Sequence, residues 1–285
     1  MGDRVTLFEV GPRDGLQNEA RPVPAADKIR LIDLLSGAGL PKIEAASFVS
    51  SRWVPQMADA AVVMAGIRRA PSVLYTALTP NLRGLDDAIA SRADEVAVFA
   101  SASEGFSRAN INCTIADSLA RYREVADAAR AAGLAVRGYV SCITQCPFDG
   151  AVEPDAVRRV ADALLRLGCY EISLGDTLGR AAPCEIACLL RSLADDLPAE
   201  RLAGHFHDTS GRALRNVEVA LDAGLRTFDA SVGGLGGCPY APGASGNVAS
   251  EALAARLAEL GLETGVDIAR LAEAAAFARS LRNRA

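Results

Sequence analysis

The segment GHFHDTSG, residues 204–211, contains both histidines of this 285-residue chain. Residues two positions apart on a β-strand point to the same side. If this segment is a strand, His205 and His207 therefore project together, as two imidazole ligands of one metal ion would. Two unrelated histidines on a solvent-facing strand are the alternative interpretation.

A second motif, GPRDG at residues 11–15, supplies a carboxylate beside a cation. Pro12 and Gly15 flank Arg13 and Asp14, which predicts a turn rather than a helix. Asp14 could then bind a metal and Arg13 could act as a fixed cation. The alternative is an ordinary ion pair on a surface turn.

Glu44 interrupts an otherwise apolar segment, KIEAASFV at residues 42–49. A buried carboxylate without a partner is costly, so a buried strand here predicts a cation nearby. Arg13, at the end of the neighbouring predicted strand, is the natural partner. The pair could serve catalysis or could be purely structural.

The candidate metal ligands form a mixed set of nitrogen and oxygen donors. They are the imidazoles of His205 and His207, the carboxylate of Asp14 and the amide oxygen of Asn247. Such a set, with room for substrate oxygens, suits octahedral Mg²⁺ or Mn²⁺. Zn²⁺ also binds imidazole, and the spacing does not exclude it.

A glycine-rich segment, GGLGGCPYAPGASGN at residues 233–247, holds six glycines and Cys238. It has no P-loop lysine, which argues against nucleotide hydrolysis. It could bind phosphate, or it could be a mobile lid that carries Cys238 over a site and excludes water. Four other cysteines are expected to be small buried residues: Cys113, Cys169, Cys184 and Cys188.

Short apolar segments alternate with longer amphipathic ones along the whole chain, and this alternation must position the motifs. The predicted strands are residues 5–10, 42–49, 73–79, 94–100, 135–142, 170–175, 202–207 and 227–232. Helical patterns lie between them, as at 117–133 and 153–168, and each of these two is expected to end at a glycine.

Eight strand and helix units predict an α/β fold, the (β/α)8 TIM barrel, with an open doubly wound sheet as the alternative. No linker or low-complexity tract divides the chain, so we expect one catalytic domain over residues 1–285. An additional C-terminal helical segment is expected at 267–281. Active sites of TIM barrels lie at the carboxyl ends of the strands, which is where the motifs above fall.

Composition narrows the class of partner. The chain is 50% hydrophobic and 23% charged, as in globular enzymes, and its net charge is −5. This charge argues against nucleic acid or an anionic membrane as partner, and no apolar segment approaches the roughly 20 residues of a membrane span. An odd number of cysteines and the absence of a leader-like N-terminus predict a reducing, cytoplasmic location.

Six segments together resemble one family, the 3-hydroxy-3-methylglutaryl-CoA lyases. They are EVGPRDGLQNE, SFVSSRWVPQMAD, RGYVSC, YEISLGDT, HFHDT and GGLGGCPYAPGASGN. The resemblance implies a metal-dependent TIM barrel that binds an acyl-CoA and cleaves it to acetyl-CoA and acetoacetate. It also implies a homodimer and a role in leucine breakdown or ketone-body formation.

The resemblance further implies roles for individual residues. The metal ligands, or residues near the metal, would be Asp14, His205, His207 and Asn247. Arg13 would stabilise negative charge on the thioester oxygen, and Glu44 would orient Arg13. Cys238 would act as an acid or proton shuttle, and Asp176 would assist proton movement at the substrate hydroxyl.

Two positions depart from the family pattern. Arg180 adds a cation at the barrel mouth, and Gln145 stands where glycine is more common. These departures leave the acyl group of the substrate open, and a longer 3-hydroxy-3-alkylglutaryl-CoA is one alternative. A related condensing acyltransferase and a binding protein without turnover are the others, but the complete residue set and the long glycine-rich segment favour the lyase.

Overall fold

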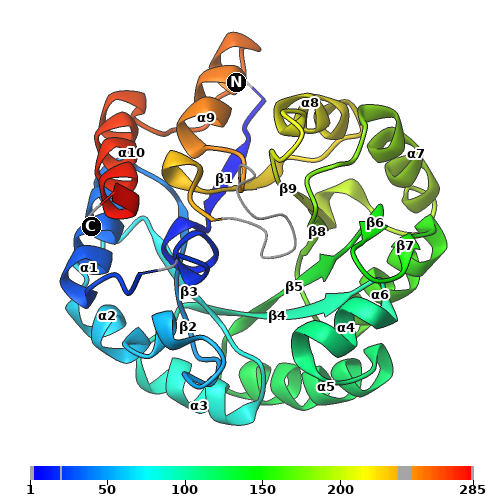
Figure 1. Ribbon diagram of the computed structural model, residues 1–285, viewed down its shortest axis with the longest axis horizontal. Coiled ribbons are helices and arrows are strands. Elements are labelled where there is room, and N and C mark those ends of the chain that lie inside the picture. Colours follow the sequence, from blue (N-terminus) through cyan, green and yellow to red (C-terminus); the bar gives the residue numbers. More distant parts are fainter. Residues whose placement is uncertain (1–2, 20, 237–245, 284–285) are drawn as a thin grey trace.

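In the computed structural model, eight parallel strands close into a barrel that is surrounded by helices (Figure 1). The structure describes residues 3–19, 21–236 and 246–283. The strand order around the barrel is β1-β10-β9-β8-β5-β4-β3-β2. These strands are β1 (Thr6–Glu9), β2 (Lys42–Ser47), β3 (Leu74–Leu78), β4 (Glu95–Ser101), β5 (Ala135–Ser141), β8 (Ile172–Asp176), β9 (Leu202–Phe206) and β10 (Thr227–Ala230). The predicted TIM barrel is confirmed, and every strand lies within about two residues of its predicted bounds.

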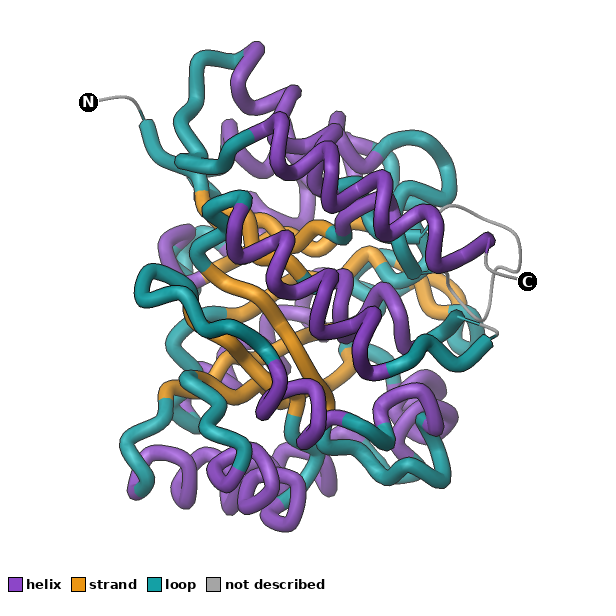
Figure 2. Tube along the Cα trace, turned by 90° about the vertical axis from the view of Figure 1, so that its left-hand side faces the viewer, coloured by secondary structure: helices purple, strands orange, loops and turns teal. Residues whose placement is uncertain are grey.

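The helices lie outside the strands, as the side view shows (Figure 2). They are α1 (Ala25–Gly37), α2 (Ala60–Gly66), α3 (Leu82–Ala90), α4 (Glu104–Ile111), α5 (Ile115–Ala131), α6 (Pro154–Arg166), α7 (Pro183–Leu193), α8 (Ala213–Asp222), α9 (Ser250–Glu259) and α10 (Ile268–Asn283). Gly133 and Gly168 follow α5 and α6 with positive φ angles of 76° and 100°. These are the helix-ending glycines predicted from the sequence.

Several short elements connect the barrel units. Three are 3₁₀ turns, η2 (Pro55–Met57), η3 (Ala199–Arg201) and η4 (Val232–Gly234), and two form an antiparallel hairpin, β6 (Gln145–Cys146) and β7 (Gly150–Ala151). The sequence pattern did not predict the hairpin, because strands of two residues are too short to show alternation.

The additional C-terminal helix is also present. α10 contacts α1, α9 and the η4 turn, and the Arg30 guanidinium lies 4.5 Å from the Phe277 ring centroid across this packing. Within the described ranges, every helix is either too short or too polar to cross a lipid bilayer.

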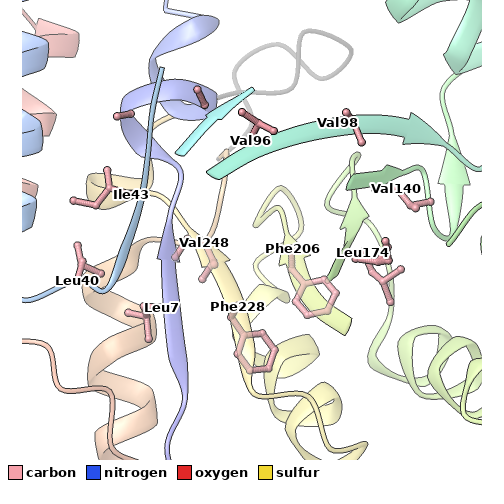
Figure 3. Close-up of a cluster of buried hydrophobic side chains, with 14 of the residues drawn as sticks. Leu7, Leu40, Ile43, Val96, Val98, Val140, Leu174, Phe206, Phe228 and Val248 are labelled. Atoms are coloured by element: carbon pink, nitrogen blue, oxygen red, sulfur yellow. The ribbon is translucent and has the colours of Figure 1, made fainter. Parts of the chain in front are cut away.

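The apolar core lies between the strands and the surrounding helices (Figure 3). Alternate residues of the strands supply it, so that each neighbouring residue faces the barrel interior instead. The outward set includes Leu7, Ile43, Val96, Val98, Val140, Leu174, Phe206 and Phe228, all buried. Burial of each large side chain of this kind contributes about 1.5–3 kcal/mol relative to exposure.

The barrel interior, in contrast, is rich in charged side chains. Arg137 on β5 donates to Asp229 on β10, and because these strands are not neighbours the contact crosses the interior. Lys42 donates to Glu95 at 2.8 Å and to the Tyr170 hydroxyl at 2.9 Å. In most TIM barrels branched aliphatic residues fill the interior, so the charged side chains inside this barrel need an explanation.

The two lysines of the chain are both held by partners. Lys28 in α1 is buried and donates to the Gln56 carbonyl and to Asp59. Lys42 has a side chain that is 20% exposed and belongs to the interior cluster with Glu95. Among the 30 basic residues these two are the only lysines, and the remainder are arginines.

The expectation that Cys113, Cys169, Cys184 and Cys188 are all buried is wrong for three of them. Cys169 is buried, but Cys113 is half-buried, and Cys184 and Cys188 are exposed on α7. The apolar side of α7 faces the barrel through other residues, such as Ile186. Cys184 and Cys188, four residues apart, therefore share the solvent-facing side.

Candidate metal centre

The two histidines lie at the carboxyl end of β9, as the strand interpretation requires. Their ring centroids are 5.2 Å apart, so both imidazoles point to one side of the chain. Nδ1 of His205 lies 3.0 Å from Oδ2 of Asp229, and its Nε2 lies 3.9 Å from Oδ2 of Asp14. One nitrogen of His205 therefore faces the barrel interior and the other faces the site.

Asp14 reaches the histidines from a single π-helical turn, η1 (Gly11–Gly15), which corrects the prediction of a non-helical turn. The Val10 carbonyl accepts hydrogen bonds from the amides of Asp14 and Gly15 at 2.7 and 3.2 Å. A bond that spans five residues widens the turn, and π turns of this kind are frequent at functional sites.

The donor atoms of Asp14, His205 and His207 could hold a metal ion, because they all lie within 4.8 Å of one another. Nδ1 of His207 is buried and has no hydrogen-bond partner among the described residues. A buried nitrogen without a partner is unfavourable in a protein interior. A divalent cation bound beside the Asp14 carboxylate would fit these donors.

Asn247 joins the group through the backbone. The Asp208 amide donates to the Gly246 carbonyl at 2.8 Å, and the Val248 amide donates to Phe206 at 3.1 Å. This pairing places Asn247 beside His207, and its Nδ2 donates to Oδ2 of Asp14 at 2.8 Å.

Gly236, within the glycine-rich segment, approaches Asn247 and Asp14. A Cβ built on Gly236 would lie 3.0 Å from Nδ2 of Asn247 and 3.6 Å from the Asp14 carbonyl oxygen. Cys238, the predicted acid or proton shuttle, lies outside the described residues. Its role remains a prediction.

Arg13 is paired with Glu44, as predicted from the cost of burying a carboxylate. Its Nε lies 2.5 Å from Oε2 of Glu44, and its Nη1 donates to Asp14 at 2.7 Å. The Tyr139 hydroxyl donates to the other Glu44 oxygen at 3.2 Å. Arg13 therefore sits beside the candidate metal ligands with its guanidinium held at two points.

A buried carboxylate outside the barrel fixes the π turn in place. Oε1 of Glu9 accepts the amides of Gly11 at 2.8 Å and Val232 at 2.9 Å, and Oε2 accepts the Ser250 hydroxyl at 2.6 Å. Burial raises the pKa of Glu9 to about 7. The side chain ties the η1 turn to the segment that leads into the glycine-rich stretch.

Electrostatics prepare two of the three donors, Asp14 and His207, for a cation. Burial opposes ionisation of Asp14, but Arg13 and the two histidines outweigh it and lower its pKa. Burial and the neighbouring His205 lower the pKa of His207 to about 4. At neutral pH the site therefore offers a carboxylate and a neutral imidazole, which are the protonation states that bind metals.

Asp176 points toward the loop that follows β8. Its carboxylate accepts the amides of Ala181 at 3.0 Å and Arg180 at 3.4 Å, and burial raises its pKa. The Arg180 side chain is exposed, and Gln145 is half-buried on β6. Asp176 is not among the clustered metal donors.

Three residues of the site were not identified from the sequence: Tyr139, Arg137 and Asp229. Arg137 and Asp229 interrupt the apolar strands AVRGYVSC and TFDASV, just as Glu44 interrupts its own strand. The same argument about buried charges would therefore have found both. Tyr139 carries no such signal, because an aromatic residue is ordinary on a strand.

Replacement of His207 with alanine is expected to weaken Mn²⁺ binding by about tenfold or more, since loss of even an indirect ligand contact commonly has that effect. Isothermal titration of the purified protein measures the change. Asp155→Asn, an exposed carboxylate on α6, serves as control and should leave the affinity unchanged. An unchanged affinity in the His207 variant would exclude this residue as a ligand.

Comparisons with known proteins agree with this geometry. Residues 4–278 match the family model described as HMGL-like. A Pseudomonas aeruginosa protein named 3-hydroxy-3-isohexenylglutaryl-CoA/hydroxy-methylglutaryl-CoA lyase is 56% identical over 271 residues, which cover 95% of this chain and 90% of that protein.

Solved structures agree with the match. The HMG-CoA lyase from Brucella melitensis superposes with a TM-score of 0.97 at 57% identity, over 99% of both chains. An Acinetobacter baumannii HMG-CoA lyase, solved with coenzyme A and 3-methylmalate, has a TM-score of 0.93 at 38% identity, over 99% of this chain and 92% of that one.

Proposed function

Because this chain belongs to the HMGL-like family, whose reaction is cleavage of 3-hydroxy-3-methylglutaryl-CoA to acetyl-CoA and acetoacetate, we propose that Asp14, His205 and His207 hold the metal for that reaction. The chain is a carbon–carbon lyase, and the family is metal-dependent. Two facts carry the assignment: Nδ1 of His207 is buried without a hydrogen-bond partner among the described residues, and donor atoms of Asp14, His205 and His207 lie within 4.8 Å of one another.

The ion that we propose is Mg²⁺ or Mn²⁺, with Zn²⁺ a poorer fit, because oxygen donors join the imidazoles. Asn247, hydrogen-bonded to Asp14, completes or borders the ligand set. When bound, a divalent ion acts as a Lewis acid toward substrate oxygens. The residues of the chain supply orientation and proton transfer.

Arg13 would stabilise the charge that develops during cleavage. Breaking the bond between C2 and C3 leaves an enolate whose negative charge lies on the thioester oxygen. A guanidinium already held by Glu44 and Asp14 needs no reorganisation to meet that charge. Glu44 would orient Arg13, and Tyr139 would orient Glu44.

Two residues are proposed to move protons. The substrate hydroxyl must lose its proton as acetoacetate forms, and Asp176, whose pKa is raised by burial, is the proposed helper. C2 of the enolate must gain a proton, and Cys238 is the proposed donor. The approach of Gly236 to Asn247 and Asp14 supports this, because Cys238 follows only two residues later.

The acyl group of the substrate has a second candidate. The Pseudomonas aeruginosa relative is named for both a methyl and an isohexenyl substrate. A longer 3-hydroxy-3-alkylglutaryl-CoA is therefore the alternative that we propose. Arg180, exposed after β8, and Gln145 on β6 are the positions through which such a preference would arise.

The domain organisation, oligomeric state, location and partners of the protein are proposed next. We propose that residues 1–285 act as one catalytic domain, since α10 packs against α1 near the start of the chain. The homodimer, the cytoplasmic location, the place in leucine breakdown and the absence of nucleic-acid and membrane partners stay predictions.

A coupled assay tests the proposed reaction. Purified protein with 3-hydroxy-3-methylglutaryl-CoA and Mg²⁺ or Mn²⁺ should release acetyl-CoA and acetoacetate in equal amounts, and EDTA should stop the release. Turnover that persists in EDTA would contradict the metal assignment. Products from a 3-alkyl analogue, with none from the methyl compound, would favour the second candidate.

A further inference from the structure

Asp229 lies directly beside His205 on the neighbouring strand. The two residues are register partners in the pairing of β10 with β9. Oδ2 of Asp229 is 3.0 Å from Nδ1 of His205, and the aspartate is only 1% exposed. This contact is on the side of the imidazole away from Asp14.

The Asp229 carboxylate is itself held inside the barrel. Arg137 donates to both of its oxygens, at 2.8 and 3.2 Å, and the Ser173 hydroxyl donates to Oδ2 at 2.6 Å. Arg137 also donates to Glu171 at 2.8 Å.

We propose that Asp229 is a positioning residue that holds His205 in the tautomer with hydrogen on Nδ1, so that Nε2 presents its lone pair to the metal site. Both Asp229 oxygens already accept hydrogen bonds from Arg137 and Ser173, so Asp229 is an acceptor here and the hydrogen between it and His205 belongs to the imidazole. In the neutral imidazole Nε2 then carries no hydrogen, and it faces Asp14. Arg137 acts one step further away, by orienting Asp229.

This positioning role of Asp229 explains why the barrel interior contains charged side chains. Buried ion pairs seldom stabilise a protein more than well-packed apolar residues of similar size. Here hydrogen bonds link Arg137 to Asp229 and Asp229 to His205, which is a candidate metal ligand. Carboxylates that accept from the second nitrogen of a ligating histidine fix the ring and raise its basicity. The inference rests on the metal site proposed above.

Nitrogen NMR can read the tautomer directly, because the chain has only two histidines. Protein made without a histidine tag and labelled with ¹⁵N-histidine is measured at pH 8.5 with saturating Mg²⁺, and His207→Gln assigns the two rings. We expect His205 to carry its hydrogen on Nδ1. Hydrogen on Nε2 of His205 instead would overturn the proposal. This result comes from the unmodified protein, so it does not depend on whether the variants fold.

Metal affinity provides the second readout. Asp229→Asn should weaken Mn²⁺ binding by about 10–100-fold and disturb the His205 tautomer. Glu95→Gln is the matched control, since it also removes a buried interior carboxylate, paired with Lys42 and remote from His205. It should keep the affinity of the unmodified protein within about threefold, whatever its melting temperature.

Other outcomes are decisive as well. Equal losses of affinity in both variants, in step with their melting temperatures, would show a structural role only and overturn the proposal. Unchanged affinity in Asp229→Asn would do the same. If the unmodified protein binds no Mn²⁺ or Mg²⁺, the metal assignment fails, while the tautomer, measured at the same pH without metal, still reports separately whether Asp229 orients His205.

Discussion

Arg13→Gln is expected to lower kcat by about three orders of magnitude or more, with Mn²⁺ affinity retained. One uncharged donor to a developing oxyanion commonly supplies about 10²–10³ in rate, and a charged donor forms a stronger hydrogen bond. The Arg13 guanidinium is buried beside the site and held by Glu44 and Asp14. Steady-state kinetics with 3-hydroxy-3-methylglutaryl-CoA measure the loss.

The control must separate chemistry from folding, because Arg13→Gln leaves Glu44 buried without its cation. The double variant Arg13→Gln/Glu44→Gln removes that unpaired charge. It should recover melting temperature but not activity. Arg68→Gln, which changes a side chain that is 87% exposed, should behave like the unmodified protein. Recovery of activity together with stability would refute a role for Arg13 in stabilising the enolate.

Cys238→Ala is expected to lower kcat by about two orders of magnitude or more while metal affinity stays unchanged. The enolate at C2 must gain a proton before acetyl-CoA leaves, and a positioned acid commonly supplies about 10²–10⁴ in rate. The same coupled assay measures kcat, and titration with Mn²⁺ measures the affinity.

The matched control for this variant is Cys184→Ala, which removes an exposed thiol from α7. It should keep full activity. A Cys238 variant with unchanged kcat would remove the proton-transfer role from this thiol. A variant with lower kcat and equally weakened metal affinity would instead place the thiol near the metal ligands.

The fold was predictable because each strand carries its own pattern. Val96 and Val98 face the helices and Ala97 faces the interior, and eight repeats of such short patterns predict a barrel. The π turn at Gly11–Gly15 was not predictable, because its hydrogen bonds to Val10 depend on contacts made by Glu9 with distant segments.

The site residues that could be predicted from the sequence are charged residues on otherwise apolar, buried strands. Glu44 on an apolar strand required a cation, and the structure supplies Arg13. Asp229 on its own strand required a cation too, and the structure supplies Arg137 from across the barrel. That partner lies 92 residues away, so no local sequence pattern links the two residues.

The hydrogen bonding of Lys28 and Lys42 to neighbouring residues has a chemical consequence for an enzyme that handles thioesters. Thioesters acylate unprotonated amines, and lysine is the side chain that supplies them. Lys28 is buried and donates to Asp59, and Lys42 donates to Glu95 and to the Tyr170 hydroxyl, so both amines are engaged in hydrogen bonds inside the protein. Every other basic side chain is a guanidinium, which stays protonated. The folded enzyme thus offers its substrate and product no lysine amine that is free of hydrogen bonds to the protein.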